Sequence, residues 1–371
     1  MEDSFGINNV ALVDGQPVSA ATDGSLRVWP ATSPVLRAAA SPVYNVGADG
    51  TSTWLAAGTG SDGIALWRWG TRTRVPVPAP PLDADETQAG AVTVAPSGKY
   101  LLGGTRGGNV LSWRLDDGGA TFTSKVGGLD GTAAYLTITP DSALAAAIAY
   151  NGTRTGLYRV DETGHLAVQA MLETPTPQLA AFSRDGRILA VALADNRVLL
   201  YSVLDPTSPS LVATLTGFAT APISLAFSPT AERLAVGEDS GHVSVWDTTD
   251  PATPRRLHEL GDAHASAYGL AFSPDGQRLA AATADNLIWG WQVTDAPRTL
   301  FALTADIGRP WDLRFIDGGR RLAVAGDDGR VRTWVVERQE ALRQICSTRG
   351  APLTGSEWSH YLPGVPTTDP C

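Results

Sequence analysis

Five histidines are the first candidates for metal binding or for general acid–base chemistry. They are His165, His242, His258, His264 and His360. None has the spacing of a metal motif such as H-E-x-x-H, and the chain contains neither a G-x-S-x-G nucleophile elbow nor a G-x-x-x-x-G-K-[ST] phosphate loop. We therefore expect no catalytic residue, no metal site, no cofactor and no enzymatic activity.

The only two cysteines, Cys346 and Cys371, both lie near the end of the chain. Such a pair suits a disulfide, which would require an oxidising compartment on the extracytoplasmic side of a membrane. The alternative is two reduced thiols in the cytoplasm. A zinc site that used His360 would still lack a fourth ligand.

The rest of the sequence is dominated by an internal repeat. An aromatic residue ends a short alternating segment every 38 to 46 residues, at Trp29, Trp67, Trp113, Tyr158, Tyr201, Trp246, Trp291 and Trp334. Each follows a segment rich in small residues, such as "LAVALAD" or "LAAATAD", which follows another apolar segment and a turn, as in "LAFSPDGQRLA". Asp-Gly, Asp-Asn and Ser-Gly pairs between them favour chain reversal. The pattern predicts short antiparallel strands that must stack, sheet beside sheet, to bury their apolar faces.

Two segments carry a family resemblance, "FSPDG" at 272–276 and "VSVWD" at 243–247. With the repeat length, they make the chain similar to WD40-repeat proteins. The resemblance implies an all-β fold, and the count of repeats predicts an eight-bladed WD40-type β-propeller over residues 1–336. It also implies a structural tetrad in the seventh blade, formed by His264, Thr283, Asp285 and Trp291; the other blades lack most of these residues.

A propeller would collect the aspartates of corresponding turns on one face. These are Asp23, Asp62, Asp195, Asp239, Asp285 and Asp327. Such carboxylates could attract a cation or a basic partner. The alternative, which we favour for metal binding, is that aspartate occurs there because its side chain bonds turn backbone.

The starts of the inner strands would lie at the mouth of the central channel. Tyr268 and Trp311 fall there, Arg309 precedes Trp311, and Tyr44 occupies a similar place. Tyrosine, tryptophan and arginine are enriched at interface hot spots. We predict that these four residues bind a partner; the alternative is that they plug the channel.

The last segment, residues 337–371, has no repeat. Ala341, Leu342 and Ile345 have helical spacing, and a second short helix is expected to carry Trp358, Tyr361 and Leu362. We interpret this helical tail as a clasp over the last blade. Its pattern "IC…PLT…EW…YLPG…C" resembles the end of WD40 regions in actinobacterial multidomain signalling proteins, which often carry a STAND-type NTPase. That resemblance implies that the chain is part of a larger protein.

Composition narrows the classes of partner. The formal net charge of −10 disfavours binding to nucleic acid, and no apolar run is long enough to cross a membrane. We expect a monomeric, non-catalytic propeller that acts as a protein–protein interaction or sensor scaffold. The alternatives are a propeller that binds a small molecule or glycan and a hydrolase or lactonase with a metal in the channel.

Overall fold

The structure is a computed structural model of the chain. It describes residues 7–13, 16–21, 25–28, 35–37, 43–49, 53–59, 63–69, 71–80, 88–261, 263–304, 310–326 and 331–337. Within these ranges, the chain forms seven four-stranded antiparallel sheets and one three-stranded sheet. This all-β organisation confirms the sequence prediction of short antiparallel strands.

Every sheet is a simple meander, in which strands adjacent in the sequence pair with each other. From the inner to the outer strand, the first four sheets are β1 (Ile7–Val13), β2 (Gln16–Ala21), β3 (Ser25–Val28) and β4 (Val35–Arg37); β5 (Val43–Ala48), β6 (Trp54–Thr59), β7 (Ile64–Arg68) and β8 (Thr73–Val75); β9 (Gln88–Val94), β10 (Tyr100–Thr105), β11 (Val110–Asp116) and β12 (Gly119–Val126); and β13 (Thr132–Ile138), β14 (Leu144–Tyr150), β15 (Arg154–Val160) and β16 (Leu166–Glu173).

The remaining sheets continue the same order. They are β17 (Pro177–Phe182), β18 (Ile188–Leu193), β19 (Arg197–Ser202) and β20 (Ser210–Leu215); β21 (Pro222–Phe227), β22 (Arg233–Glu238), β23 (Val243–Asp247) and β24 (Arg255–Leu260); β25 (Ala267–Phe272), β26 (Arg278–Thr283), β27 (Leu287–Gln292) and β28 (Arg298–Thr304); and the three-stranded β29 (Pro310–Ile316), β30 (Arg321–Gly326) and β31 (Val331–Val335). A 3-10 turn at Asp317–Gly319 joins β29 to β30.

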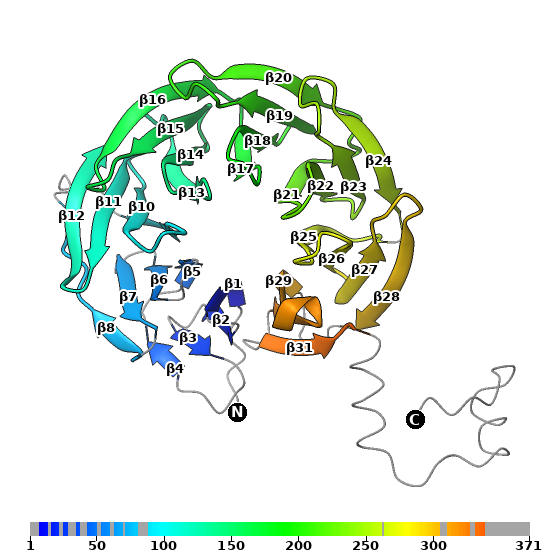
Figure 1. The fold of residues 1–371 in the computed structure, drawn as a ribbon, viewed down its shortest axis with the longest axis horizontal. Helices are drawn as coiled ribbons and strands as arrows, with labels where there is room; N and C mark the ends of the chain where they lie inside the picture. Colours follow the sequence, from blue (N-terminus) through cyan, green and yellow to red (C-terminus); the bar gives the residue numbers. More distant parts are fainter. Residues whose placement is uncertain are drawn as a thin grey trace, which may run out of the picture.

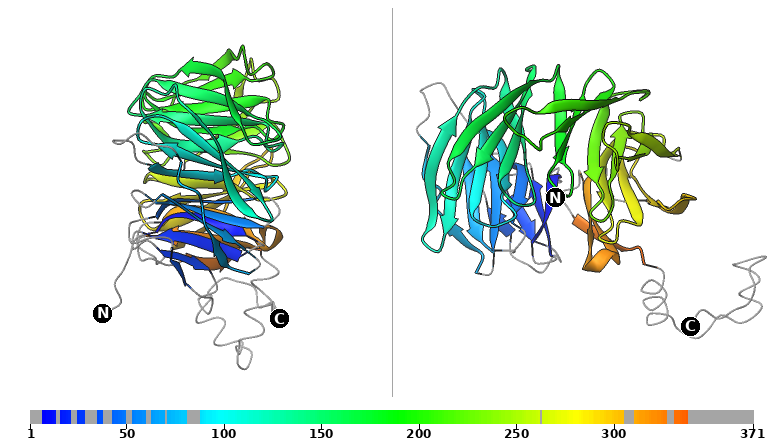
Figure 2. Two further views of the ribbon diagram at one scale, coloured as in Figure 1. Left: turned by 90° about the vertical axis from the view of Figure 1, so that its left-hand side faces the viewer. Right: turned by 45° about the horizontal axis from the view of Figure 1, so that its top comes forward.

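The sheets stand around a central axis and close into a ring (Figure 1). The inner strands β1, β5, β9, β13, β17, β21, β25 and β29 contact one another in sequence order, and β29 contacts β1. Seen from the side, the ring is a disc of stacked sheets (Figure 2). This is the architecture of a β-propeller.

Small side chains in the second strands allow neighbouring sheets to pack closely. All six residues of β10 and all six of β18 are buried. One apolar cluster joins Ile148 and Leu157 of one sheet to Leu189 and Tyr201 of the next, and similar clusters lie between other neighbours. Strands buried on both faces are apolar along their whole length, which explains segments such as "LAVAL".

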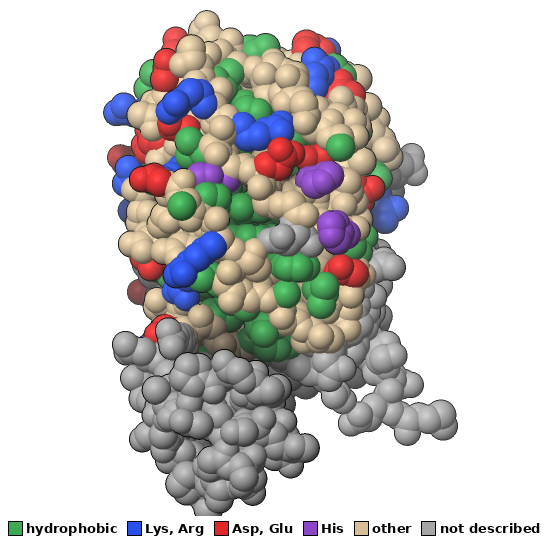
Figure 3. Space-filling view, turned by 90° about the vertical axis from the view of Figure 1, so that its right-hand side faces the viewer, with side chains coloured by type: hydrophobic (Ala, Val, Ile, Leu, Met, Phe, Trp, Pro, Cys, Tyr) green, Lys and Arg blue, Asp and Glu red, His purple; other side chains and the backbone are tan. Residues whose placement is uncertain are grey.

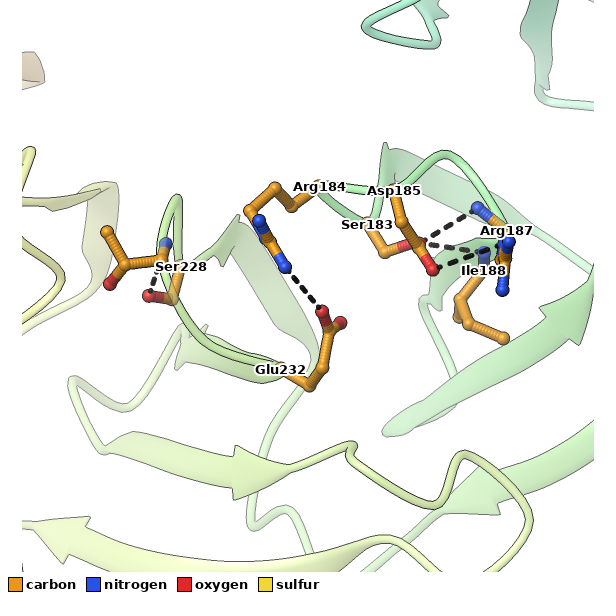
Figure 4. A network of polar contacts seen from close by, with 8 residues as sticks. Ser183, Arg184, Asp185, Arg187, Ile188, Ser228 and Glu232 are labelled. Carbon is orange, nitrogen blue, oxygen red and sulfur yellow. Dashed lines mark hydrogen bonds and ion pairs between the residues drawn. The ribbon is translucent and has the colours of Figure 1, made fainter.

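The turns between the first and second strands form a network at one end of the channel. The hydroxyl of Ser183 donates to Asp185 Oδ1 at 2.6 Å, and this carboxylate also accepts from the backbone N–H of Arg187. Figure 4 shows these contacts beside the ion pair of Arg184 with Glu232 of the next sheet, at 3.4 Å. Although partial burial raises the pKa of Asp185, the hydrogen bonds and the positive charge of Arg187 hold this pKa below its ordinary value.

Glycine completes these turns because it accepts a positive φ. Gly186 has φ +71° and Gly276 has φ +67°, as expected from "SRDG" and "SPDG". The reversals between the second and third strands also contain the predicted residues in the left-handed region, with Asn196 at +64° and Asn286 at +67°. Both sets of turn predictions are confirmed at these positions.

The sequence predicted eight complete blades. In the described residues there are seven four-stranded sheets, and the remaining sheet, β29–β31, has three strands. No α-helix occurs among the described residues. The predicted helical tail lies outside the described ranges after Glu337, as do Cys346 and Cys371.

Candidate functional site

The inner strands share an irregularity at one end of the channel. Their pairing with the second strand shifts near the first residues, so that an extra residue is inserted into the inner strand. In single-residue cases the inserted residues are Asn8, Tyr44, Ala134, Gln178, Ile223, Tyr268 and Trp311. A larger shift interrupts β9 near Gly90. Such β-bulges re-aim side chains and are frequent beside functional sites.

These bulges form one ring because the inner strands all run in the same direction. Each four-stranded meander begins at the axis and ends at the rim, and the next sheet repeats the order. The bulged ends of the inner strands therefore surround one mouth of the channel, and the turns between the first and second strands surround the other.

A cavity of about 560 Å³ lies along the channel. Residues of β13, β17, β21, β25 and β29 line it. Its polar side chains are those of Tyr135, Gln178, Tyr268 and Arg314, with Ser224 in the wall, and its apolar residues include Ile223 and Leu225. The cavity thus combines aromatic rings, apolar surface and hydrogen-bond donors.

Several contacts fix the walls. The Ser224 hydroxyl donates to the carbonyl of Ala267 at 2.6 Å, which joins β21 to β25. Arg314 Nη1 donates to the carbonyl of Leu313 at 2.8 Å, and Gln178 Nε2 donates to the carbonyl of Thr176 at 3.4 Å. The guanidinium and amide groups are therefore held against the backbone near the cavity.

Tyr268 lies where the sequence predicted, on an inner-strand start at the cavity, and is half-buried. Trp311 and Tyr44 occupy corresponding bulges, but their side chains lie outside the described part, as does all of Arg309. The structure brings Tyr268 together with two residues that sequence reasoning missed, Tyr135 and Arg314. Tyr135 is 39% exposed.

Both omissions have a structural cause. Tyr135 follows the bulged Ala134, so the register of β13 changes between the position that the repeat identifies and the tyrosine. Arg314 lies further along β29, whose inner edge has no paired neighbour, so that side chains beyond the strand start also reach the channel. An aromatic or basic residue within four positions of an inner-strand start was the signal available in the sequence.

The turn aspartates that are described have local partners. Asp195 pairs with Arg197, Asp239 accepts a hydrogen bond from the Ser266 hydroxyl at 2.7 Å, and Asp285 accepts one from Thr283. Asp23, Asp62 and Asp327 lie outside the described residues. Within the described ranges, no group of three or more His, Cys, Asp or Glu side chains is placed to hold a metal ion.

The proposed tetrad is brought together only in part. The Thr283 hydroxyl donates to Asp285 Oδ1 at 2.6 Å, and Trp291 is buried. His264 and Asp285 are both exposed. The Thr283–Asp285 contact therefore joins a buried hydroxyl to an exposed carboxylate at the turn between β26 and β27.

Among the described residues, no helix is both long and apolar enough to cross a membrane.

Comparison with known proteins supports the architecture. The family model "WD domain, G-beta repeat" matches residues 209–247 and 255–292. A search of curated proteins finds no match. A crystal structure of the computationally designed Ika8 protein is similar with a TM-score of 0.72 and 18% identity, covering 90% of this chain and 97% of that one.

A chain from a crystal structure of the Mitotic Checkpoint Complex is similar with a TM-score of 0.63 and 18% identity, covering 79% of this chain and 86% of that one. At such identity these likenesses establish the fold alone. The structure is thus a β-propeller that contains WD40-type repeats.

Proposed function

We propose that this chain is a non-catalytic interaction module that binds a protein or peptide partner at the bulged mouth of its channel. The observation that supports this proposal is the ring of β-bulges around a cavity that contains Tyr135, Tyr268 and Arg314. These residue types form interface hot spots, and a rigid propeller holds them without a large entropic cost on binding. Trp311, Tyr44 and Arg309 extend the proposed surface.

Binding of a small molecule or glycan is the second candidate. A volume of about 560 Å³ falls within the range of ligand pockets, and tyrosine rings beside an amide and a guanidinium suit a polar ligand. A hydrolase or lactonase with a channel metal has less support, because the described lining of the cavity includes no carboxylate or histidine.

Capture of partners from the producing organism tests the proposal. Wild type, Tyr268→Ala and Trp311→Ala are compared with Tyr150→Ala, which changes a 48% exposed tyrosine that does not line the cavity. We expect a protein that wild type and Tyr150→Ala retain and the other two lose. Equal capture by all four variants contradicts the site; saturable binding of a sugar or metabolite that displaces no protein supports the second candidate.

The wider organisation is also proposed. We infer that β29–β31 belongs to an eighth blade, that the propeller occupies residues 1–336, and that residues 337–371 form a separate tail. By resemblance, the module belongs to a larger signalling protein. A Cys346–Cys371 disulfide would place it on the extracytoplasmic side, and intact mass with and without reductant tests this bond: an unchanged mass means free thiols.

A further inference from the structure

The three-stranded sheet has an unusual outer edge. In each of the seven other sheets, the third strand pairs with a fourth on its outer side. Within the described residues, β31 pairs with β30 only. Its outer edge therefore presents backbone hydrogen-bonding groups to which another strand could pair.

The burial of equivalent residues shows that packing is incomplete at this edge. The repeat aromatics of the third strands, at Trp67, Trp113, Tyr158, Tyr201, Trp246 and Trp291, are 0% to 8% exposed. Trp334 holds the same place, since it pairs with Leu322 as Trp291 pairs with Leu279. Trp334 is only half-buried.

Val336, which directly follows β31, shows the same difference in burial. The backbone N–H of Val336 donates to the carbonyl of Arg320 at 2.9 Å, as that of Val293 donates to Gln277 at 2.8 Å. Val293 is fully buried, whereas Val336 is half-buried. Trp334 and Val336 are thus both more exposed than the residues in the same register of other sheets.

A groove of about 510 Å³ lies beside this edge. Leu300, Phe301 and Leu303 of β28 contribute its apolar side, and Val335, Val336 and Glu337 contribute the other. Leu300 is 38% exposed. Figure 3 shows hydrophobic side chains gathered over this side of the molecule, in the region of β28.

We propose that the C-terminal segment, residues 338–371, docks in this groove and covers the outer edge of β31. The segment begins directly after Glu337, which itself lines the groove. It therefore reaches the site as an intramolecular ligand at high effective concentration. Its 34 residues include apolar side chains that can replace those of a fourth strand, at Leu342, Ile345, Trp358, Tyr361 and Leu362.

The other sheets indicate what this segment must supply. Fourth strands bury leucines against the neighbouring blade, at Leu172 of β16, Leu215 of β20 and Leu260 of β24. The equivalent residue that faces β31 is Leu303 of β28, which pairs with Ile288 as Leu260 pairs with Val243. The cluster between the last two sheets leaves Leu303 only partly buried, together with Phe301, Trp334 and Val336. We therefore expect the apolar side chains of the docked segment to cover Trp334 and Val336. The C-terminal segment would then complete the packing of the last sheet.

Hydrogen exchange of the 331–337 region tests the proposal. The full chain is compared with a chain that ends at Glu337 and with one that lacks residues 1–6. We expect the first deletion to speed exchange of this region at least tenfold and the second to leave it unchanged. Adding a peptide of residues 338–371 to the shortened chain should restore protection.

A surface variant keeps the test decisive if the shortened chain does not fold. Leu300→Asp in the full chain should reproduce the faster exchange, whereas Leu211→Asp, at a 51% exposed position on β20 away from the groove, should not. Unchanged exchange in both the shortened chain and Leu300→Asp overturns the proposal. Faster exchange on removal of residues 1–6, but not of the tail, also overturns it and assigns the edge to the N-terminal segment.

Discussion

The two ends of the channel are made by the same repeat but differ in the regularity of their inner strands. At the turn end, side chains close each reversal and also join neighbouring sheets: Thr230 donates to the carbonyl of Asp275 at 3.1 Å, and Arg278 donates to that of Gly319 at 2.7 Å. At the opposite end, each inner strand carries a bulge whose extra residue is not paired in the ladder.

This difference separates stability from recognition within one repeat. At the turn end, Thr139, Ser183 and Ser273 each donate a hydroxyl hydrogen bond to the aspartate two residues later, and that aspartate also accepts a hydrogen bond from a backbone N–H. The bulge end carries a different residue in almost every strand, from Ala134 to Gln178 to Tyr268. Sequence can vary at the bulges because the packing between sheets does not depend on them.

The largest effect is expected for a side chain added at a turn glycine. In Gly276→Val, the new Cβ would collide with the Thr230 hydroxyl, and valine would have to adopt φ +67°. We expect a loss of about 2–4 kcal/mol in the free energy of unfolding, measured by chemical denaturation. Ala134→Val, at an exposed bulge, is the matched control, with a change below about 0.5 kcal/mol. Equal losses would remove the distinction between the two ends.

A smaller, pH-dependent effect is expected for Asp185→Asn. The substitution weakens the bonds from Ser183 and Arg187, at a carboxylate whose pKa is lowered in the folded protein. We expect a loss of about 0.5–1 kcal/mol at pH 7, since solvent screens this half-exposed group.

The sign of the pH dependence follows from the lowered pKa. The carboxylate contributes stability above its unfolded pKa of about 3.9, and this contribution disappears as the pH falls through the lower folded pKa. The difference between wild type and Asp185→Asn should therefore shrink below about pH 4 in denaturation curves. A difference that stays constant down to pH 2 would show that the charge of Asp185 is not involved.

Much of the structure at both ends of the channel could be predicted from the sequence, because repeat spacing and turn chemistry depend on short segments. The strands, the Asp-Gly turns and the place of Tyr268 at the channel all depend on short segments whose pattern recurs. The bulges were not predicted, because an inserted residue in β13 leaves no compositional trace in "GTAAYLTI". Tyr135 was missed for that reason.

Packing between sheets was less predictable than the strands themselves. Trp334 matches the other repeat aromatics in sequence and in register, yet it is only half-buried in the structure. The tetrad residues Thr283 and Asp285 do meet, but His264 is exposed. Such features are decided by tertiary contacts.

A still smaller effect is expected for the ion pair between two neighbouring turns. Arg184 and Glu232 are 3.4 Å apart, and the arginine side chain is 52% exposed (Figure 4). Exposed ion pairs contribute about 0–1 kcal/mol, so Arg184→Ala should lower the melting temperature by no more than a few degrees. The matched control is Arg187→Ala on the same turn, whose Nε lies 3.7 Å from Asp185. A loss as large as that of Gly276→Val would mean that inter-sheet ion pairs, and not the turn backbone, hold this end together.

The smallest effect on stability is expected at the bulge end, where the effect on binding should be largest. Tyr135→Ala removes a ring that is 39% exposed at the cavity, so the free energy of unfolding should change by less than about 0.5 kcal/mol. Tyr135→Phe keeps the ring and removes only the hydroxyl. If the ring supplies contact area, the phenylalanine variant should retain a captured partner that the alanine variant loses, measured by quantitative pull-down. Loss of the partner in both variants would assign recognition to the hydroxyl, and a marked loss of stability in Tyr135→Ala would mean that this end of the channel is built for packing as the turn end is.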